Sequence, residues 1–376
     1  MEYDFYVCLT ALSRIFSSRC NDGFRLVQEA GGVREVFMLS EKELSDMMPG
    51  GSRYISSISD HSILDWAAAE VDWAFSHGIR LLYLDGEGYP SRLKQCSDAP
   101  LMLYCMGDAQ FENRRVLSVV GTRRATYYGR DFCRRILESL SFLDPKPLII
   151  SGLALGIDGC AHMSALDFGM ETVAVLPCAL DTIYPQRHRE LALRIASHGA
   201  LLTDFSRGTP VMAHTFVRRN RIIAGLSDAT LLAESFLPGG GMITASLANS
   251  YNRDVFAVPG RNTDESFAGC NSLIASNSAI LVDKPDSLAR SMGWETPQSA
   301  RQQKLLFPQV EGDLKKSIVE ALRDAASCTA EDLARRCGSG LDELSAALLE
   351  MELDGLLSST SGGRYVLRFA DKRDFM

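Results

Sequence analysis

Short apolar runs alternate with amphipathic segments through the middle of the chain. Most runs end at a glycine or a polar turn, and the segments that follow carry apolar residues at helical spacing. This alternation is typical of βα units, which place helices on the faces of a largely parallel sheet. Fewer than eight complete units are present, so we predict an open, doubly wound α/β sheet and no barrel. The predicted strands are residues 79–84, 101–105, 116–120, 148–151, 172–176, 201–205, 229–234, 255–258 and 279–282, with the first two beside the main sheet.

The two ends of the chain have different patterns. Residues 1–78 are predicted to form short helices, and their glycine turn resembles helix-hairpin-helix and sterile-alpha-motif-like modules. Residues 294–311 are rich in Gln and Pro, as expected for a linker. Residues 312–376 contain three helical segments followed by a hairpin, which is the pattern of a winged helix. We therefore expect a helical domain at 1–78, a sheet domain at 79–293 and a winged helix at 312–376.

Composition narrows the class of protein. With 376 residues the chain exceeds a single ordinary core, and its net charge of −8 argues against a surface coated in nucleic acid while allowing a local basic site. The acidic N-terminus, and apolar runs far shorter than the roughly 20 residues that span a bilayer, favour a cytoplasmic protein without membrane contact. The ten cysteines and six histidines are dispersed, so we expect reduced thiols, no metal site and no cofactor.

The winged-helix segment has an acidic candidate recognition helix. Residues 341–354 contain five Asp or Glu and no Lys or Arg. A DNA groove lined by phosphates would repel such a helix. We therefore expect this domain to contact protein or to act as a spacer, and not to bind duplex DNA in the usual way.

Basic residues concentrate around one glycine turn. Residues 114–135 include seven arginines and one acid, within an acidic chain. The turn, Gly121-Thr122-Arg123, follows a predicted strand, so backbone amides, a hydroxyl and a guanidinium can meet one phosphate there. A ligand-free tight turn and a solvated helix face are the alternatives. Because open α/β sheets bind ligands at the carboxyl ends of their strands, we favour a focused anion site.

Other segments are candidates for the same edge. The run Arg219-Asn220-Arg221 opens an apolar segment, and buried cations need an anionic partner, either a carboxylate of the fold or a ligand phosphate. Glycines 239–241 and Thr244 follow a predicted strand and can form a second anion nest. Further candidates for phosphate binding are Ser151, Gly152, Arg187, Gly239, Gly240 and Gly241. At most two aromatic residues are expected to stack on bases, from Tyr127, Tyr128, Tyr184, Phe205, Phe216 and Phe236.

Ser151, Asp158 and His162 do not have the arrangement of a catalytic set. Ser151 is not in a Gly-x-Ser-x-Gly elbow. Asp158 and His162 lie one helical turn apart, which leaves Ser151 without a clear base. We therefore predict no catalytic residue, and we expect Asp158 and His162 to shape the loop around an anion.

Two functions are compatible with such an edge. The glycine nest resembles the Pro-Gly-Gly-x-Gly-Thr loop of the lysine-decarboxylase-like nucleoside-monophosphate phosphoribohydrolases, in which a Glu three residues after the Thr carries out hydrolysis. Leu247 occupies that position here, and its side chain cannot move a proton. The missing carboxylate favours the other function, a platform that holds a polyanion without chemistry.

The ordered motifs of the chain resemble those of the DNA-processing protein A family (DprA, also called Smf). The resemblance covers nearly the whole chain and implies an N-terminal helical module, an extended Rossmann-like domain and often a C-terminal winged helix. The matching motifs are Val120-Gly121-Thr122-Arg123, Ser151-Gly152-Leu153-Ala154, Gly156-Ile157-Asp158 with His162, Tyr184-Pro185, residues 219–225, Gly240-Gly241 with Thr244, and Val258-Pro259-Gly260.

The resemblance also implies a function and partners. Members bind single-stranded DNA, dimerise through the Rossmann-like domain and load the RecA-type recombinase onto incoming strands in natural transformation. The family's Gly-Ser/Thr-Arg strand-binding motif corresponds to Gly121-Thr122-Arg123. Some members carry a lysine after Tyr-Pro as a second DNA contact; Gln186 stands there in this chain, and Arg187 is a candidate replacement.

Overall fold

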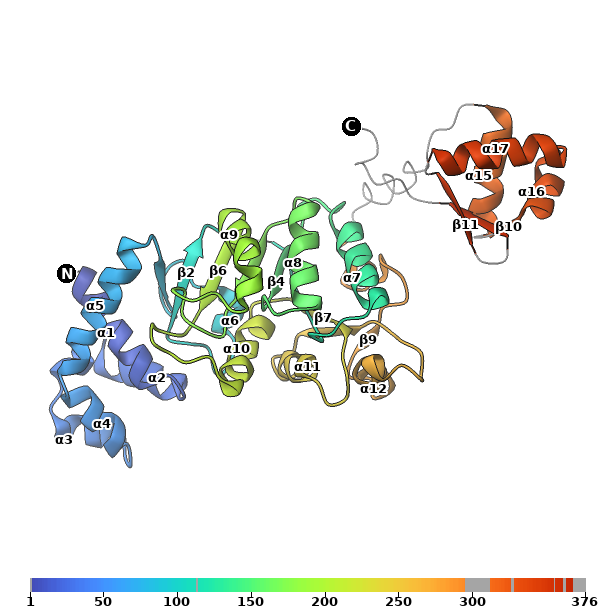
Figure 1. The fold of residues 1–376 in the computed structure, drawn as a ribbon. Helices are drawn as coiled ribbons and strands as arrows, with labels where there is room; N and C mark the ends of the chain where they lie inside the picture. Colours follow the sequence, from blue (N-terminus) through green and yellow to red (C-terminus); the bar gives the residue numbers. More distant parts are fainter. Residues whose placement is uncertain are drawn as a thin grey trace. The chain divides into compact units, whose positions relative to one another are not determined.

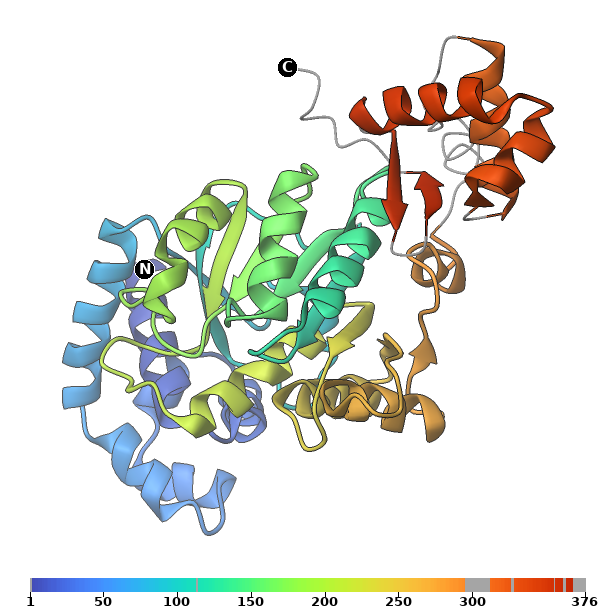
Figure 2. The ribbon, with the colours of Figure 1, turned by 45° about the vertical axis from the view of Figure 1, so that its right-hand side comes forward.

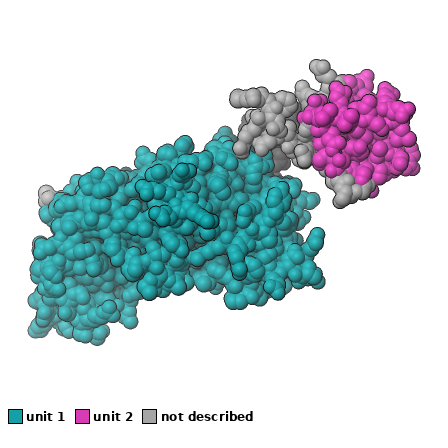
Figure 3. Space-filling view, viewed as in Figure 1, with its two compact units in different colours: residues 1–296 teal, residues 297–376 magenta. Residues whose placement is uncertain are grey.

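The protein consists of two compact units, Met1–Thr296 and Pro297–Met376 (Figure 3). The structure is a computed structural model that describes residues 2–112, 114–294, 312–325, 328–354, 356–360 and 363–367. Apart from Trp294, the predicted linker lies outside the described residues. Each unit has its own hydrophobic core, so each is described by itself.

The first unit begins with the short helices expected from the sequence. Ser40 caps α3 through a capping box, in which the Glu43 carboxylate accepts a 2.8 Å hydrogen bond from the Ser40 amide. Gly31 ends α2 at φ +85°, a conformation that favours glycine. These helices and the sheet share one buried core, so the structure groups them in a single unit. The bounds are α1 Glu2–Ile15, α2 Cys20–Ala30, η1 Glu35–Met38, α3 Glu41–Met47, α4 Ser52–Ser59 and α5 Ser62–Ser76.

A nine-stranded sheet forms the centre of this unit (Figures 1 and 2). Its order is β1-β2-β6-β5-β4-β3-β7-β8-β9, with β1 and β2 antiparallel to their neighbours and the remaining pairs parallel. The predicted doubly wound α/β sheet is confirmed, including the two strands beside its parallel part. The bounds are β1 Arg80–Tyr83, β2 Met102–Gly107, β3 Val116–Gly121, β4 Leu148–Ser151, β5 Thr172–Val175, β6 Gly199–Thr203, β7 Ala229–Glu234, β8 Asp254–Ala257 and β9 Ile280–Leu281.

Helices cover both faces of the parallel strands. Figures 1 and 2 show α7, α8 and α9 on one face and α10, α11 and α12 on the other. Strands β4 to β7 are consequently buried along their whole length. The bounds are α6 Ser91–Lys94, α7 Tyr127–Leu140, α8 Ile157–Asp167, η2 Gln186–His188, α9 Arg189–Ser197, α10 Ala213–Gly225, α11 Gly240–Ser250, η3 Glu265–Phe267, α12 Ala268–Ala275 and α13 Ser287–Ser291.

The direction of strand addition reverses between β3 and β7. From β3 the sheet grows outward through β4, β5 and β6, whereas from β7 it grows through β8 and β9. The loop after β3 leads to α7 on one face, and the loop after β7 leads to α11 on the other. Diverging loops at such a switch point open a crevice at the carboxyl ends of the strands, where open α/β sheets bind ligands.

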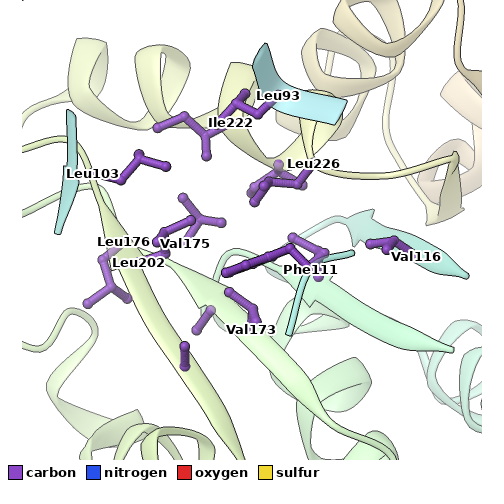
Figure 4. Packing of buried hydrophobic residues seen from close by; sticks show 14 of the residues in the cluster. Leu93, Leu103, Phe111, Val116, Val173, Val175, Leu176, Leu202, Ile222 and Leu226 are labelled. Atoms are coloured by element: carbon purple, nitrogen blue, oxygen red, sulfur yellow. The ribbon is translucent and has the colours of Figure 1, made fainter. Parts of the chain in front are cut away.

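Buried side chains fix α10 beside this crevice. In the core shown in Figure 4, Ile222 of α10 and Leu226, which directly follows the helix, lie near Val175 and Leu176 at the end of β5, and all four are at most 1% exposed. Because this packing sets the position of the helix, the preceding turn of α10 is held over the carboxyl ends of the strands.

The second unit has a winged-helix fold, as predicted. Three helices pack around Ile318, Leu333, Leu344, Leu348 and Met351, which are buried. A short strand, β10, joins the predicted hairpin to form a three-stranded sheet of order β10-β12-β11. The bounds are α15 Asp313–Ala325, β10 Cys328–Thr329, α16 Ala330–Cys337, α17 Leu341–Leu353, β11 Leu357–Thr360 and β12 Arg364–Leu367.

The cysteines form no disulfides, and most of them are buried. All ten cysteines are free, and all but Cys8 and Cys337 are buried. Within the described ranges, no helix is long and apolar enough to cross a bilayer. The same ranges contain no group of three or more His, Cys, Asp or Glu that could hold a metal ion.

Candidate nucleic-acid interface

A cleft of about 370 Å³ opens at the switch point between β3 and β7. Its walls are the loop after β3, the loop after β7 and one side of α10. The fold therefore brings together segments that are more than a hundred residues apart in the chain. Predicted site residues that line the cleft are Gly121, Thr122, Arg123, Asp158, Arg219, Asn220, Gly239, Gly240, Gly241 and Thr244.

The loop after β3 can present the side chains of Thr122 and Arg123 to a ligand, but not the Thr122 amide. That amide donates to the Glu234 carbonyl at 2.8 Å, so the prediction that it binds phosphate is wrong. Gly121 is required by packing, since an added Cβ would lie 2.6 Å from Ile157 Cγ1. The Thr122 hydroxyl accepts from the Arg124 amide at 3.1 Å and keeps its own proton for a ligand.

Arg123 and Arg124 present exposed guanidinium groups at the cleft. The Arg123 guanidinium lies 4.5 Å from the centroid of the Phe216 ring, and that of Arg124 lies 5.6 Å from the Phe236 ring. Neither arginine forms an ion pair with any residue that the structure describes. Two cations that lie over aromatic rings and form no ion pair with these residues are suited to bind an external anion.

The loop after β7 exposes the start of an uncapped helix. Gly239 is the N-cap of α11, an 11-residue helix, and no side chain caps this end. Open space lies in front of Gly240, whereas a Cβ on Gly239 or Gly241 would lie within 2.5 Å of a neighbouring side-chain atom. The first amides and the dipole of α11 therefore favour an anion in the cleft. Thr244, one turn further, is only 1% exposed.

Arg219 lies on the floor of the cleft and is 3% exposed. Its Nη1 donates to the Gly152 carbonyl at 2.6 Å and to the Val175 carbonyl, so the guanidinium joins α10 to the ends of β4 and β5. An added Cβ on Gly152 would lie 2.1 Å from Nη1, which explains the glycine at that position. Burial lowers the pKa of Arg219 to about 10, against the opposing effect of Asp158, and the side chain stays charged at neutral pH.

Two predicted phosphate ligands have internal partners instead. Arg221 is buried and its Nη2 donates to Asp204 Oδ2 at 2.6 Å, in an ion pair that Arg218 shares at 2.8 Å. Burial opposes ionisation of Asp204, but the two arginines outweigh it and lower its pKa. The Ser151 hydroxyl is also buried and donates to the Val119 carbonyl at 2.6 Å. The predictions for the Arg221 and Ser151 side chains are therefore wrong, because carboxylate and carbonyl groups of the fold satisfy them.

Asp158 and His162 have separate environments. Asp158 borders the cleft, and burial raises its pKa while Arg219 and the loop amides at Ala154 and Gly152 act in the opposite direction. Its predicted loop-shaping role stays a prediction. His162 is fully buried, its Nδ1 lies 2.7 Å from Thr172 Oγ1, and burial lowers its pKa to about 3. His162 therefore packs α8 against β5 and does not line the cleft.

The remaining candidates differ in their access to the cleft. Arg187 is exposed on η2 and is not among the lining residues, so its role stays a prediction. Of the aromatic candidates, Phe216 and Phe236 line the cleft, whereas Phe205 is only 4% exposed. Arg124 also lines the cleft, although it was not among the site residues predicted from the sequence. Its position next to Arg123 in the basic cluster is the sequence signal that could have included it.

Comparison with known proteins identifies the family of the chain. Residues 80–293 match the family model described as DNA recombination-mediator protein A, and residues 308–363 match the DprA winged helix domain. The first match covers more than half of the chain. The chain belongs to the DprA family. This confirms the resemblance expected from the motifs.

Relatives of this DprA-family chain match most of its length. Protein Smf of Escherichia coli is 34% identical over 303 residues, covering 79% of this chain and 80% of the relative. The putative DNA processing protein DprA of Mycobacterium tuberculosis is 32% identical over 378 residues, covering 95% and 93%.

Two solved DprA structures share the fold at 28% sequence identity. DprA from Streptococcus pneumoniae gives a TM-score of 0.62 and covers 77% of this chain and 97% of that chain. DprA from Helicobacter pylori, whose structure concerns its single-stranded DNA binding mode, gives a TM-score of 0.51 and covers 57% and 95%.

Proposed function

We propose that this DprA-family chain binds single-stranded DNA by holding successive phosphates in the cleft between β3 and β7. The observation that carries the proposal is the charge of the lining. Its charged side chains are Arg123, Arg124, Arg219 and Asp158, which leaves an excess of positive charge in a protein of net charge −8. The single-stranded DNA binding of the Helicobacter pylori relative supports this assignment.

The contacts that we propose are divided between the two loops. Arg123 and the Thr122 hydroxyl hold one phosphate, and the amides at Gly240 and Gly241 hold the next. Arg219 supplies positive charge from below, and Asn220, whose Oδ1 accepts from Arg219 Nε at 3.2 Å, orients that guanidinium. Phe216 stacks on a base, an interaction worth about 1–3 kcal/mol.

A flexible strand suits this cleft better than a duplex. A volume of about 370 Å³ at the ends of strands accommodates a few groups of a bent chain and not a rigid double helix. The winged helix offers no basic recognition helix, since α17 carries no Lys or Arg. We therefore expect a preference for single-stranded over duplex DNA.

The partners that we propose rest on family membership. A second copy of the chain, joined through the Rossmann-like domain, doubles the length of strand that is held. The RecA-type recombinase is then loaded onto this strand. A strand-exchange assay that starts from DNA covered by a single-strand-binding protein measures this step, and an absence of stimulation by the purified protein would contradict it.

Fluorescence anisotropy with labelled oligothymidine tests the binding site. With three to five phosphates held per protomer, log affinity should fall with log salt at a slope of about −2 to −3.5. An unlabelled duplex of the same length should compete poorly. Equal competition by the duplex, together with a slope near zero, would remove the basis for the proposal.

The same protein preparation tests the alternative function. Incubation with nucleoside monophosphates should release no base, because Leu247 stands where the phosphoribohydrolases carry their catalytic Glu. Release of base at a rate proportional to protein concentration would favour the enzyme.

A further inference from the structure

Helix α17 of the winged-helix unit buries one side and exposes apolar residues on another. Leu344, Leu348 and Met351 are at most 1% exposed and form part of the core. Leu341, Leu349 and Leu353 are 51%, 59% and 80% exposed, respectively. The first group is therefore apolar because it forms the core of the unit. Packing in that core does not account for the apolar character of the second group.

Two of the three exposed leucines belong to one continuous strip. At about 100° per residue, the exposed Ala346, Leu349 and Leu353 fall within about 60° of the helix circumference, and Ser345 and Glu352 separate them from Leu341. This strip covers about the last two turns of α17. Contiguous exposed apolar surface of this kind marks interaction sites in proteins.

Acidic residues surround this strip. Asp342, Glu343 and Asp354 are exposed, Glu350 is ion-paired with Lys315 at 2.9 Å, and Glu352 accepts from the Ser359 amide at 2.9 Å. Glu350 and Glu352 thus hold α17 to α15 and β11, whereas Asp354, at the C-terminal end of the helix, opposes the helix dipole. Their charge would repel DNA phosphates and also the same face of a second copy.

We propose that α17 is a docking surface for a basic amphipathic helix of a partner protein, with Leu349 and Leu353 as apolar anchors. Leucines of the partner pack on the strip, and its Lys or Arg side chains face the surrounding acids. Apolar anchors supply most of the affinity, and the charges select a basic partner and speed its association.

Two short synthetic helical peptides test the proposal with the full-length chain. Both carry the same leucine stripe, one flanked by lysines and the other by glutamates, and binding is measured by fluorescence anisotropy. The lysine peptide should bind at least about tenfold more tightly, and more weakly as salt rises. Equal binding of both peptides would overturn the proposal.

Variants of the chain locate the binding surface. The L349S/L353S variant should weaken binding of the lysine peptide at least about tenfold, and it should fold normally because both side chains are largely exposed. The matched control is Leu193→Ser on α9 of the first unit, 62% exposed, which should bind as the unchanged chain does. The E343Q/D354N variant should weaken the lysine peptide and reduce the salt dependence.

Three results would overturn the assignment. One is unchanged peptide binding by the L349S/L353S variant with its circular dichroism spectrum intact. Another is self-association of the chain that this variant abolishes, which would identify a second copy as the occupant. The third is duplex DNA binding that depends on the same leucines.

Discussion

Replacing Arg123 by alanine is the most direct perturbation of the proposed strand site. The side chain is exposed and its guanidinium carbon lies 4.5 Å from the centroid of the Phe216 ring, while its attraction to Asp158 is opposed by its repulsion of Arg219. Its loss should therefore cost the fold no more than about 1 kcal/mol. A charge-assisted hydrogen bond to a phosphate contributes about 1.5–3 kcal/mol, so oligothymidine affinity should fall about 10- to 150-fold.

Salt dependence separates a lost phosphate contact from a general loss of binding. Measured by anisotropy at several salt concentrations, the R123A variant should show a log–log slope about 0.7 less steep than that of the unchanged chain. Arg123→Lys should retain the slope and part of the affinity. Arg25→Ala is a matched control, since this exposed arginine of α2 pairs with Glu29 at 3.7 Å, away from the cleft. An R123A variant with unchanged affinity and slope would refute the placement of the site.

The other predictions concern stacking, the cleft floor and pH. Phe216→Ala should weaken oligothymidine binding by about 1–3 kcal/mol in the same assay, while Tyr127→Ala, 86% exposed and outside the cleft lining, should not. Arg219→Gln should lower the free energy of unfolding in urea by about 3 kcal/mol, because it leaves buried carbonyls and Asp158 without their cation; a loss under 1 kcal/mol would contradict the structural role. His162 has a folded-state pKa of about 3, below its ordinary value. As the pH falls below about 6.5, its imidazole therefore takes up a proton in the unfolded chain but not in the folded chain, which favours unfolding. Between pH 7 and pH 5 this group should remove about 2 kcal/mol of stability, and His162→Asn should lack that part of the pH dependence in urea titrations at each pH.

The fold could be predicted from the sequence because its signals are local. Each strand from β1 to β9 overlaps the predicted segment, and the winged-helix elements lie where the apolar spacing placed them. The one added strand, β10, has two residues and no alternation to detect. The two loops of the cleft were also predictable, since each follows a strand, contains glycine and had to lie at the carboxyl edge of the sheet.

The roles of neighbouring cations in α10 required the three-dimensional structure. The sequence Arg218-Arg219-Asn220-Arg221 leaves open whether a carboxylate or a ligand partners each arginine. Arg218 and Arg221 are three residues apart and therefore face the same side, where both meet Asp204 after β6. Arg219 is rotated by about 100° from Arg218 and points toward the ends of β4 and β5.

The sequence by itself determined the order of strands and helices, the glycine turns and the concentration of arginine, because each is set by spacing along the chain. Only the tertiary structure decided which groups remain for a ligand. Arg123 and Arg124 form no ion pair with a carboxylate of the described residues, whereas Arg221 and the Thr122 amide are satisfied internally. The physical reason is that a buried polar group must find its partner across the fold, and that partner is distant in the sequence.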